Sequence, residues 1–600
     1  MFKRAGRYLQ PHLRRVHSQA SSSAHSACQN TRTNPRITIA SAVLVGSAVV
    51  YAGVKKVYND PITSPNSGSV SKQDEVVAAG ARTALADTSD PDVLHTLVWG
   101  SNKHEVLAPD NGREASIRTP VVSKWLDNVA LRDLALHEKH GACVDARGDV
   151  YQWGEEFFGG SAIPRVPKRT LRGKNIVQVQ LTDSKLYALS ASGKIYALAT
   201  NAAAQELRPG APTPASDSWW GTGWLWGEDE IIDFAEIAPK DSFAWGESFT
   251  SISAGKNHLL AATSKGRAFA HPVNKLANHY GQLGFREFNI PDPSSAITKL
   301  SHLHVELTPK SIADPFVNAS RSVRVIPDSD STTIVLPSIN DSSVHFCPNI
   351  FEIPVLRGVK VAQVAAGSRS SFARTVDGKV VGWGANDYGQ IGLGSNVVLD
   401  TIIIPTEVVL WRMIPSDIRT SCIGVSAGGD LTAFTVERTK DSTTTVDLLI
   451  AGNGQHGGLG NNTYTNAQSN PVKAKNVSGL QQYSDKAHSL EPVIPEEITI
   501  SSTGHILLAL SSSAGSGGVG GRDLMLWGKN YDSELGNGKK SSLAVPNILV
   551  QPNGDRFMLM KRQAKEVRDL KGAVWKRGVK VEQHPATGYG NSAVYWKIAA

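Results

Sequence analysis

Short runs in which apolar and polar residues alternate, each closed by a glycine, recur through most of the chain. Residues 147–154 (RGDVYQWG) closely resemble residues 377–384 (DGKVVGWG). Two weaker copies begin at Gly193 and Gly266, and three others end at Gly100, Gly452 and Gly528. Alternation with a period of two predicts β-strands. The seven copies therefore predict seven equivalent strands.

Glycine-rich turns flank many of these strands. An Ala-Gly element or a variant of it precedes most of them, at residues 139–142, 183–186, 254–258, 366–370, 427–430 and 503–505. A second glycine-containing element follows some of them, at residues 280–284, 388–392 and 534–536. Glycine permits the positive φ angles of tight turns, and a terminal aromatic residue can fill the wedge between neighbouring sheets. Each unit therefore predicts one blade of a β-propeller.

The repeat resembles that of the regulator of chromosome condensation repeat family, whose members form seven-bladed β-propellers. The resemblance covers residues 93–598 and is strongest at 360–394. The N-terminal copy, residues 93–100, contains only the last strand of a unit, and residues 579–583 and 586–595 supply the missing front half. We therefore expect an all-β fold, a seven-bladed β-propeller closed by N- and C-terminal strands. Such closure removes exposed sheet edges.

The copies are unevenly spaced along the chain. Aligned positions 198 and 271 lie 73 residues apart, and positions 271 and 383 lie 112 residues apart. Because one blade needs about 50 residues, the excess predicts inserts at about 199–250 and 285–355. The second insert is rich in Ser, Pro and Asp, and we expect a long, partly mobile loop there.

The first 92 residues differ from the rest of the chain. Residues 1–36 are rich in Arg and Ser and contain no acid, which is typical of a mitochondrial presequence, although a disordered basic arm would have the same composition. Residues 37–54 carry no charge and would span about 27 Å as a helix, enough for a transmembrane helix. The alternative for them is a cleaved or soluble segment. Residues 55–92 have the composition of a linker.

A presequence followed by a single span indicates the mitochondrial inner membrane. If Lys55 and Lys56 anchor the matrix end of the span, the positive-inside rule places the propeller in the matrix. If the span arrests during import, the propeller lies in the intermembrane space. We favour the matrix.

The formal charge of +8 comes from the N-terminal region. Residues 1–59 contain nine basic side chains and no acidic one, whereas residues 60–600 contain 53 basic and 54 acidic side chains. The body is therefore close to neutral. Its charge alone gives no reason to expect nucleic-acid binding.

Five of the thirteen tryptophans lie inside the first insert, within a single stretch of 27 residues. They could pack the insert onto the propeller, or they could bind a partner, since tryptophan is enriched at binding hot spots. Acidic residues between them disfavour an anionic lipid surface, so a protein partner is the better functional hypothesis. The candidate partner-binding residues are Trp219, Trp220, Trp224, Trp226 and Trp245.

A basic segment occupies residues 556–580, and its apolar spacing predicts a helix over 559–572. It could be a solvated charged face, or a patch that contacts RNA or cardiolipin. The candidate basic patch contains Lys561, Arg562, Lys565, Arg568, Lys571, Lys576 and Arg577.

No motif in the chain points to catalysis. Residues 452–457 match G-x-G-x-x-G, but no helical pattern follows, and the match falls in a glycine-rich loop of the repeat. Cys143 lies in an alternating strand and is expected to be a core residue. His258 and His505 recur at one repeat position, which favours a turn hydrogen bond over catalysis. We therefore expect no enzyme activity, no catalytic residue, no cofactor and no metal site.

The sequence thus predicts a membrane-anchored scaffold with a mitochondrial membrane protein or respiratory subcomplex as its partner. Presequence, span and repeats together resemble a fungal mitochondrial member of the family that is associated with assembly of respiratory complex III (cytochrome bc1). Two alternatives remain open. The protein could promote guanine-nucleotide exchange on a mitochondrial GTPase, as some family members do, or it could bind mitochondrial RNA or ribosomes through residues 556–580.

Overall fold

The computed structural model describes residues 93–109, 115–159, 166–207, 232–291, 302–312, 323–327, 340–411, 414–441, 443–485, 488–511, 521–551 and 554–599. The predicted presequence, transmembrane helix and linker lie outside these residues. Within the described ranges, no helix is long and apolar enough to cross a membrane.

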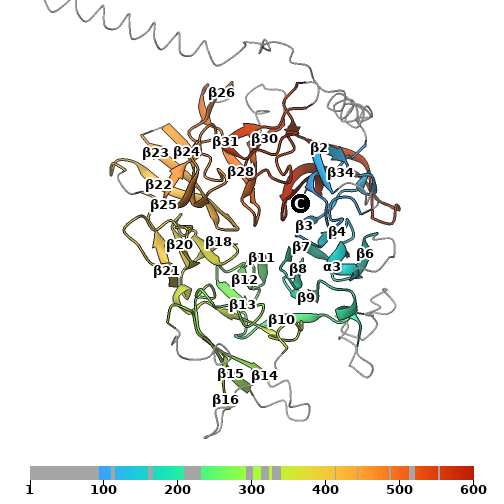
Figure 1. Cartoon of the computed structure of the whole chain (residues 1–600), viewed down its shortest axis with the longest axis vertical. Helices are drawn as coiled ribbons and strands as arrows, with labels where there is room; N and C mark the ends of the chain where they lie inside the picture. Colours follow the sequence, from blue (N-terminus) through green and yellow to red (C-terminus); the bar gives the residue numbers. More distant parts are fainter. Residues whose placement is uncertain are drawn as a thin grey trace, which may run out of the picture. The chain divides into compact units, whose positions relative to one another are not determined.

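The described residues form short antiparallel strands with very few helices (Figure 1). Five sheets have four or five strands each. The first joins β2 (Ser116–Val122), β1 (Leu97–Ser101), β35 (Asn591–Ile598), β34 (Val574–Thr587) and β33 (Lys561–Arg568). The second contains β3 (Asp133–Leu136), β4 (Gly141–Val144), β5 (Val150–Trp153) and β6 (Lys168–Leu171).

The other three sheets of this size follow in the second half of the chain. One contains β18 (Val361–Ala366), β19 (Ser370–Thr375), β20 (Val380–Ala385) and β21 (Thr401–Val408). The next contains β22 (Arg419–Gly428), β23 (Leu431–Lys440), β24 (Thr443–Gly454) and β25 (Thr465–Lys473). The last contains β28 (Pro495–Ile500), β29 (His505–Leu510), β30 (Arg522–Gly528), β31 (Leu543–Ile548) and the short β32 (Met558–Leu559).

A sixth sheet of eight strands consists of two four-stranded runs. The first run is β7 (Ile176–Leu181), β8 (Lys185–Ser190), β9 (Ile195–Ala199) and β10 (Ala235–Pro239). The second is β11 (Phe249–Ala254), β12 (His258–Thr263), β13 (Ala268–Pro272) and β17 (Asn349–Glu352). A short parallel pairing of β10 with β17 joins the two runs. Figure 1 shows the sheets around a common centre, and the predicted all-β, propeller-like fold is confirmed.

Smaller elements connect these sheets. A separate sheet contains β14 (Glu287–Pro291), β15 (His302–Leu307) and β16 (Val323–Pro327), and a hairpin contains β26 (Gln481–Ser484) and β27 (Ser489–Pro492). The short helices are α3 (Glu155–Phe158) and the 3-10 turns η1 (Lys124–Leu126), η2 (Ala203–Gln205) and η5 (Pro354–Leu356).

The predicted closure by both ends of the chain is confirmed. Strand β1 pairs with β35, and the register places Leu97 opposite Val594 and Gly100 opposite Asn591. Strand β35 in turn pairs with β34. The N-terminal copy and the C-terminal half-unit therefore complete one sheet.

All seven predicted repeat copies form strands at equivalent positions, namely β1, β5, β9, β13, β20, β24 and β30. The glycine that ends several of them is required by backbone geometry. Gly384 has a φ of 104°, and a Cβ there would lie 2.5 Å from the carbonyl oxygen of Arg369 in the preceding turn. Gly154 has the same φ, and its Cβ would lie 2.5 Å from the carbonyl oxygen of Lys139. Glycine therefore follows tryptophan in these strands because another backbone lies too close for a Cβ atom.

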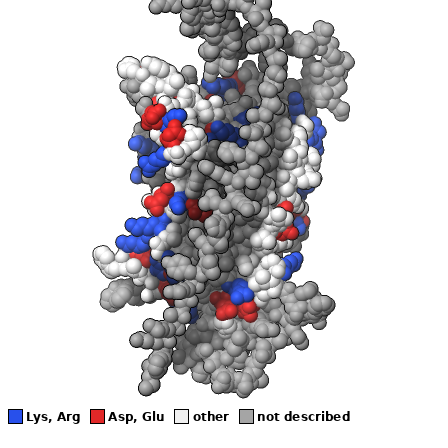
Figure 2. Space-filling view, turned by 90° about the vertical axis from the view of Figure 1, so that its left-hand side faces the viewer, with Lys and Arg blue, Asp and Glu red and all other residues white. Residues whose placement is uncertain are grey.

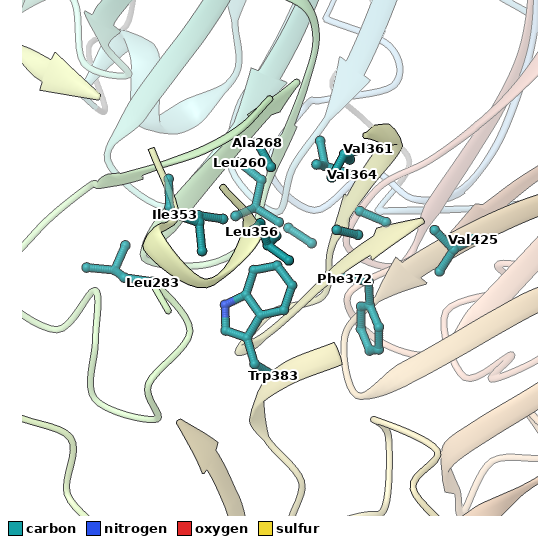
Figure 3. Close-up of a cluster of buried hydrophobic side chains, with 14 of the residues drawn as sticks. Leu260, Ala268, Leu283, Ile353, Leu356, Val361, Val364, Phe372, Trp383 and Val425 are labelled. Atoms are coloured by element: carbon teal, nitrogen blue, oxygen red, sulfur yellow. The ribbon is translucent and has the colours of Figure 1, made fainter. Parts of the chain in front are cut away.

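Tryptophans of these strands fill the space between neighbouring sheets, as predicted. Trp99, Trp153, Trp383 and Trp527 are all fully buried. Figure 3 shows the indole of Trp383 beside Leu260 and Leu356, which come from the preceding part of the ring. Cys143 is also buried in its strand, as expected.

Two sequence predictions are wrong. Residues 559–572 do not form a helix, because residues 561–568 form strand β33 and pair with β34. Lys, Arg, Gln and Glu favour helices intrinsically, but pairing with a long neighbouring strand overrides that weak preference. The insert at 285–355 is not only a loop, since it contains the β14–β16 sheet and strand β17.

Candidate partner-binding surfaces

Indole hydrogen bonds fix the loops at one end of the ring. The Nε1 of Trp383 donates to the carbonyl oxygen of Gln282, in the loop after β13, at 2.9 Å. Equivalent bonds run from Trp99 to Glu534 (2.7 Å), from Trp153 to Val106 (2.7 Å) and from Trp527 to Gly458 (2.9 Å). Each of these loops is therefore held by the sheet next to it.

An asparagine side chain shapes three of these loops, and also the loop after β20, from within. The Oδ1 of Asn386 accepts from the backbone N–H of Ile391, five residues later, at 3.2 Å. The same bond occurs at Asn102–Leu107 (3.0 Å), Asn278–Leu283 (3.2 Å) and Asn530–Leu535 (2.9 Å). Our sequence reasoning missed these residues. They could have been found in the sequence, because in each case an asparagine stands five residues before the apolar residue to whose backbone N–H it binds.

His258 links two sheets through a serine. Its Nε2 lies 2.8 Å from the Oγ of Ser371, which itself donates to the carbonyl oxygen of Gln282 at 2.7 Å. Because the serine hydroxyl donates its one proton to the carbonyl oxygen, its Oγ can only accept from the histidine, and Nε2 carries the donated hydrogen. Burial lowers the pKa of His258 to about 3, which keeps the ring neutral at ordinary pH. The expected structural role is confirmed, although this hydrogen bond joins two sheets.

His505 repeats this arrangement where the ring closes. Its Nε2 lies 3.1 Å from the Oγ of Ser592, which donates to the carbonyl oxygen of Glu534 at 2.9 Å. Burial lowers the pKa of His505 to about 3 as well. Because Trp99 donates to the same carbonyl oxygen, the closure is fixed by two donors from the terminal strands.

The turns between the first and second strands of the sheets surround a cavity of about 460 Å³. We call this end of the ring the turn end. Its charges are paired from sheet to sheet: Asp183 lies 3.4 Å from His137 and 3.3 Å from Lys256. Arg369 pairs with Asp430 at 2.9 Å and with Asp387 at 2.7 Å. The turn end is therefore polar without a dominant sign of charge.

A second cavity, of about 490 Å³, lies between the same inner strands. Lys597 approaches Asp133 within 3.6 Å at its wall, and burial raises the pKa of that carboxyl group. Groups of three or more His, Cys, Asp and Glu that could hold a metal ion are absent from the described part of the chain. Neither cavity gathers the side chains of a recognisable catalytic site.

Both large inserts leave the ring at the turn end. His258 pairs with Pro272, so strand β13 returns to the end at which β12 begins, and β9 returns beside β8 in the same way. Of the five candidate tryptophans, Trp245 is 98% exposed, but it lies between the end of β10 and the start of β11, at the end of the ring opposite the turn end. Trp219, Trp220, Trp224 and Trp226 lie outside the described residues.

The seven candidate basic residues are brought together on the hairpin formed by β33 and β34. We call residues 561–582 the basic hairpin. Arg562 is partly buried, with its guanidinium 4.4 Å from the ring centroid of Trp596. Arg568 pairs with Glu566 at 2.7 Å. The remaining five candidates, Lys561, Lys565, Lys571, Lys576 and Arg577, are exposed.

Charges of both signs are mixed elsewhere on the surface. Figure 2 shows Lys and Arg side chains interspersed with Asp and Glu on one side of the protein. For example, the exposed Lys379 pairs with Glu407 of strand β21 at 3.5 Å. This mixing agrees with the near-neutral charge of the body.

The fold and its repeats define the class of protein. Two models of the Regulator of chromosome condensation (RCC1) repeat match the chain, at residues 361–390 and 377–435. The chain therefore contains RCC1 repeats within an RCC1-like propeller fold.

Individual relatives are similar over part of the chain. Protein FMP25, mitochondrial, of Saccharomyces cerevisiae is 24% identical over 41% of this chain and 37% of that protein. The RCC1 domain-containing protein RUG3, mitochondrial, of Arabidopsis thaliana is 41% identical over 52% of this chain and 54% of that protein. The match thus spans about a third to a half of these curated relatives. The crystal structure of Prp20p from Saccharomyces cerevisiae has a TM-score of 0.48 and 16% identity, and covers 85% of this chain and 93% of that chain.

Proposed function

We propose that this protein is a non-enzymatic mitochondrial scaffold that holds a partner protein at the turn end of its propeller. The observation that carries the proposal is that the chain leaves β9 and β13 for both large inserts at an end whose loops are clamped from sheet to sheet. Rigid loops on a rigid ring are the usual carriers of binding function. The two relatives named as mitochondrial support the compartment.

We further propose that the ring has seven blades. The eight-stranded sheet supplies two of them, because its two runs have separate inner strands, β7 and β11. The cavity walls support this count, since residues of seven inner strands contribute to them: β3, β7, β11, β18, β22, β28 and β34.

The proposed location is the mitochondrial inner membrane, with the propeller in the matrix. The support is the Arg-rich, acid-free composition of residues 1–36 and the eighteen uncharged residues 37–54 before Lys55 and Lys56. Protease protection in mitoplasts tests it. A propeller digested once the outer membrane is opened would contradict the matrix location.

The proposed partner is an immature subunit or subcomplex of respiratory complex III. The support is the resemblance of presequence, span and repeats to a bc1-assembly member of the repeat family. The tryptophan-rich insert would hold the partner, since large aromatic side chains provide most of the binding energy at many interfaces.

The test is co-purification from mitochondria with tagged full-length protein. Replacing Trp219 and Trp220 by Ala should abolish recovery of complex III subunits and leave the circular dichroism spectrum unchanged. A matched control replaces Tyr483 and Leu490, which are 53% and 61% exposed on the β26–β27 hairpin, and should keep full recovery.

Two results would contradict this function. Unchanged recovery with the tryptophan variant would remove the insert from the interface. Faster nucleotide release from a mitochondrial GTPase in the presence of the protein would favour the exchange-factor alternative.

A further inference from the structure

The basic hairpin concentrates positive charge on a body whose other residues carry a small net negative charge. Residues 561–582 contain eight basic and three acidic side chains, a formal charge of +5. Residues 60–600 contain 53 basic and 54 acidic side chains, so outside the hairpin these numbers fall to 45 and 51. The sign of the hairpin is therefore opposite to that of the remaining body.

One face of the hairpin is used to hold the fold together. Ala564, Val567 and Val579 are buried in a cluster with Leu94 and Trp596. Arg562 stacks over Trp596 and donates to the carbonyl oxygen of Val93, the first described residue. These contacts give Arg562 a structural role. They also place Val93 beside the hairpin.

Other positions of the hairpin, on its strands and in its turn, present basic side chains to solvent. Lys565, Lys571, Lys576, Arg577 and Lys580 are exposed. Lys571, Lys576 and Lys580 form no ion pair with any residue that the structure describes. The one aromatic residue in 561–582, all of which are described, is Trp575, which is partly buried and packs against the cluster of Val567 and Trp596.

The composition of these exposed positions distinguishes among polyanions. Single-stranded RNA is held by aromatic stacking and by the planar, bidentate contacts of arginine, and these positions offer lysine point charges instead. A dense layer of lipid phosphates needs only such charges at the right distance, and each contributes about 1 kcal/mol near an anionic membrane.

The position of the hairpin in the ring also suits docking on a lipid surface. Strand β34 reaches the turn end at Thr587, so its first residues, which pair with β33, lie toward the opposite end of the ring. Val93 lies beside the hairpin, since its carbonyl oxygen accepts from Arg562. A surface bound to the hairpin would therefore lie away from the turn end.

We propose that the exposed lysines of the basic hairpin dock on an anionic phospholipid surface. Docking there turns the hairpin end toward the membrane and leaves the turn end and its inserts free for a protein partner. The inference shares the membrane segment with the proposed function, but it rests on the hairpin charges.

The test uses the full-length protein and two kinds of vesicle, phosphatidylcholine alone and phosphatidylcholine with cardiolipin. Wild-type protein should bind the anionic vesicles more tightly, and the triple variant Lys571→Ser, Lys576→Ser, Lys580→Ser should lose about tenfold or more of that affinity. The matched control changes Lys265, Lys360 and Lys540 to Ser. These lysines are exposed in other parts of the ring, so the control should retain wild-type binding.

The arms of this experiment separate the two hypotheses. Binding to phosphatidylcholine alone reports insertion through residues 37–54, and its absence would contradict the proposed anchor without affecting the hairpin. Equal loss in both triple variants would show a net-charge effect and overturn the hairpin proposal. A tighter, hairpin-dependent affinity for single-stranded RNA than for anionic vesicles would overturn it too.

Discussion

The closure of the ring offers a direct test of how the sheets are joined. The carbonyl oxygen of Glu534 is buried and accepts from the indole of Trp99 at 2.7 Å and from the hydroxyl of Ser592 at 2.9 Å. Replacing Trp99 by Phe removes one donor and largely preserves the packing. Replacing Ser592 by Ala removes the other donor and also leaves the Nε2–H of His505 without its acceptor.

The magnitudes follow from the net cost of buried hydrogen bonds. Loss of the indole bond and a small packing change should cost about 1–2 kcal/mol for Trp99→Phe. Ser592→Ala should cost about 1–3 kcal/mol, because it leaves a buried donor unpaired. In either single variant the Glu534 carbonyl keeps one donor. In the double variant it keeps neither, so the combined loss should exceed the sum by about 1–3 kcal/mol.

The assay is urea unfolding followed by far-ultraviolet circular dichroism for the wild type, both single variants and the double variant. An equivalent cycle exists at Gln282, where Trp383 and Ser371 donate to one carbonyl oxygen. It should give a coupling of the same sign and similar size. The mismatched pair Trp99→Phe with Ser371→Ala shares no acceptor and should be additive within about 0.5 kcal/mol.

Additive losses in both matched cycles would refute this reasoning, because the shared carbonyl would then not depend on its two donors. Equal coupling in matched and mismatched pairs would refute it too, since the effect would then be a general loss of cooperativity.

Three further predictions concern stability. The folded-state pKa of His505, about 3, lies below its unfolded value, so the unfolded chain binds more protons and the free energy of unfolding decreases as the pH is lowered. Between pH 7 and pH 5, His505→Gln should therefore lose about 2 kcal/mol less stability than wild type in urea titrations, and equal losses would contradict the buried neutral ring. Burial lowers the pKa of Lys185 to about 8, below its unfolded value, so the free energy of unfolding should rise with pH. Between pH 7.5 and pH 9.5, wild type should gain about 2 kcal/mol of stability relative to Lys185→Met. Parallel pH profiles of the two proteins would contradict this. Gly384→Ala, whose Cβ would meet the carbonyl oxygen of Arg369, should cost about 2 kcal/mol or more in thermal unfolding. The control Gly358→Ala has a φ of 81° and nothing within 4 Å of its Cβ, and should cost about 1 kcal/mol; a larger loss than for Gly384→Ala would reverse the expected order.

The repeat units could be predicted from the sequence because their signals are local. Alternating residues and a Trp-Gly ending identify the third strand, and the paired half-units at the two ends predict that β1 joins β35. Both signals depend on neighbouring residues or on counting copies. The Ala-Gly turns were visible for the same reason.

Other features depend on contacts between distant residues. The two donors to the Glu534 carbonyl oxygen, Trp99 and Ser592, lie 435 and 58 positions away in the sequence, so no local pattern predicts these bonds. Strand β33 was mistaken for a helix because its residues favour helices locally, whereas β34 decides its conformation. The clustering of the basic residues was visible in the sequence. Their division into an inward Arg562 and outward lysines required the hairpin register.

The most direct test of the proposed scaffold function is the state of complex III in mitochondria that lack this protein. Blue native electrophoresis should show loss of mature complex III and accumulation of a smaller subcomplex. The wild-type chain should restore the mature complex, and the Trp219→Ala, Trp220→Ala variant should not. Normal complex III in the absence of the protein would contradict the account.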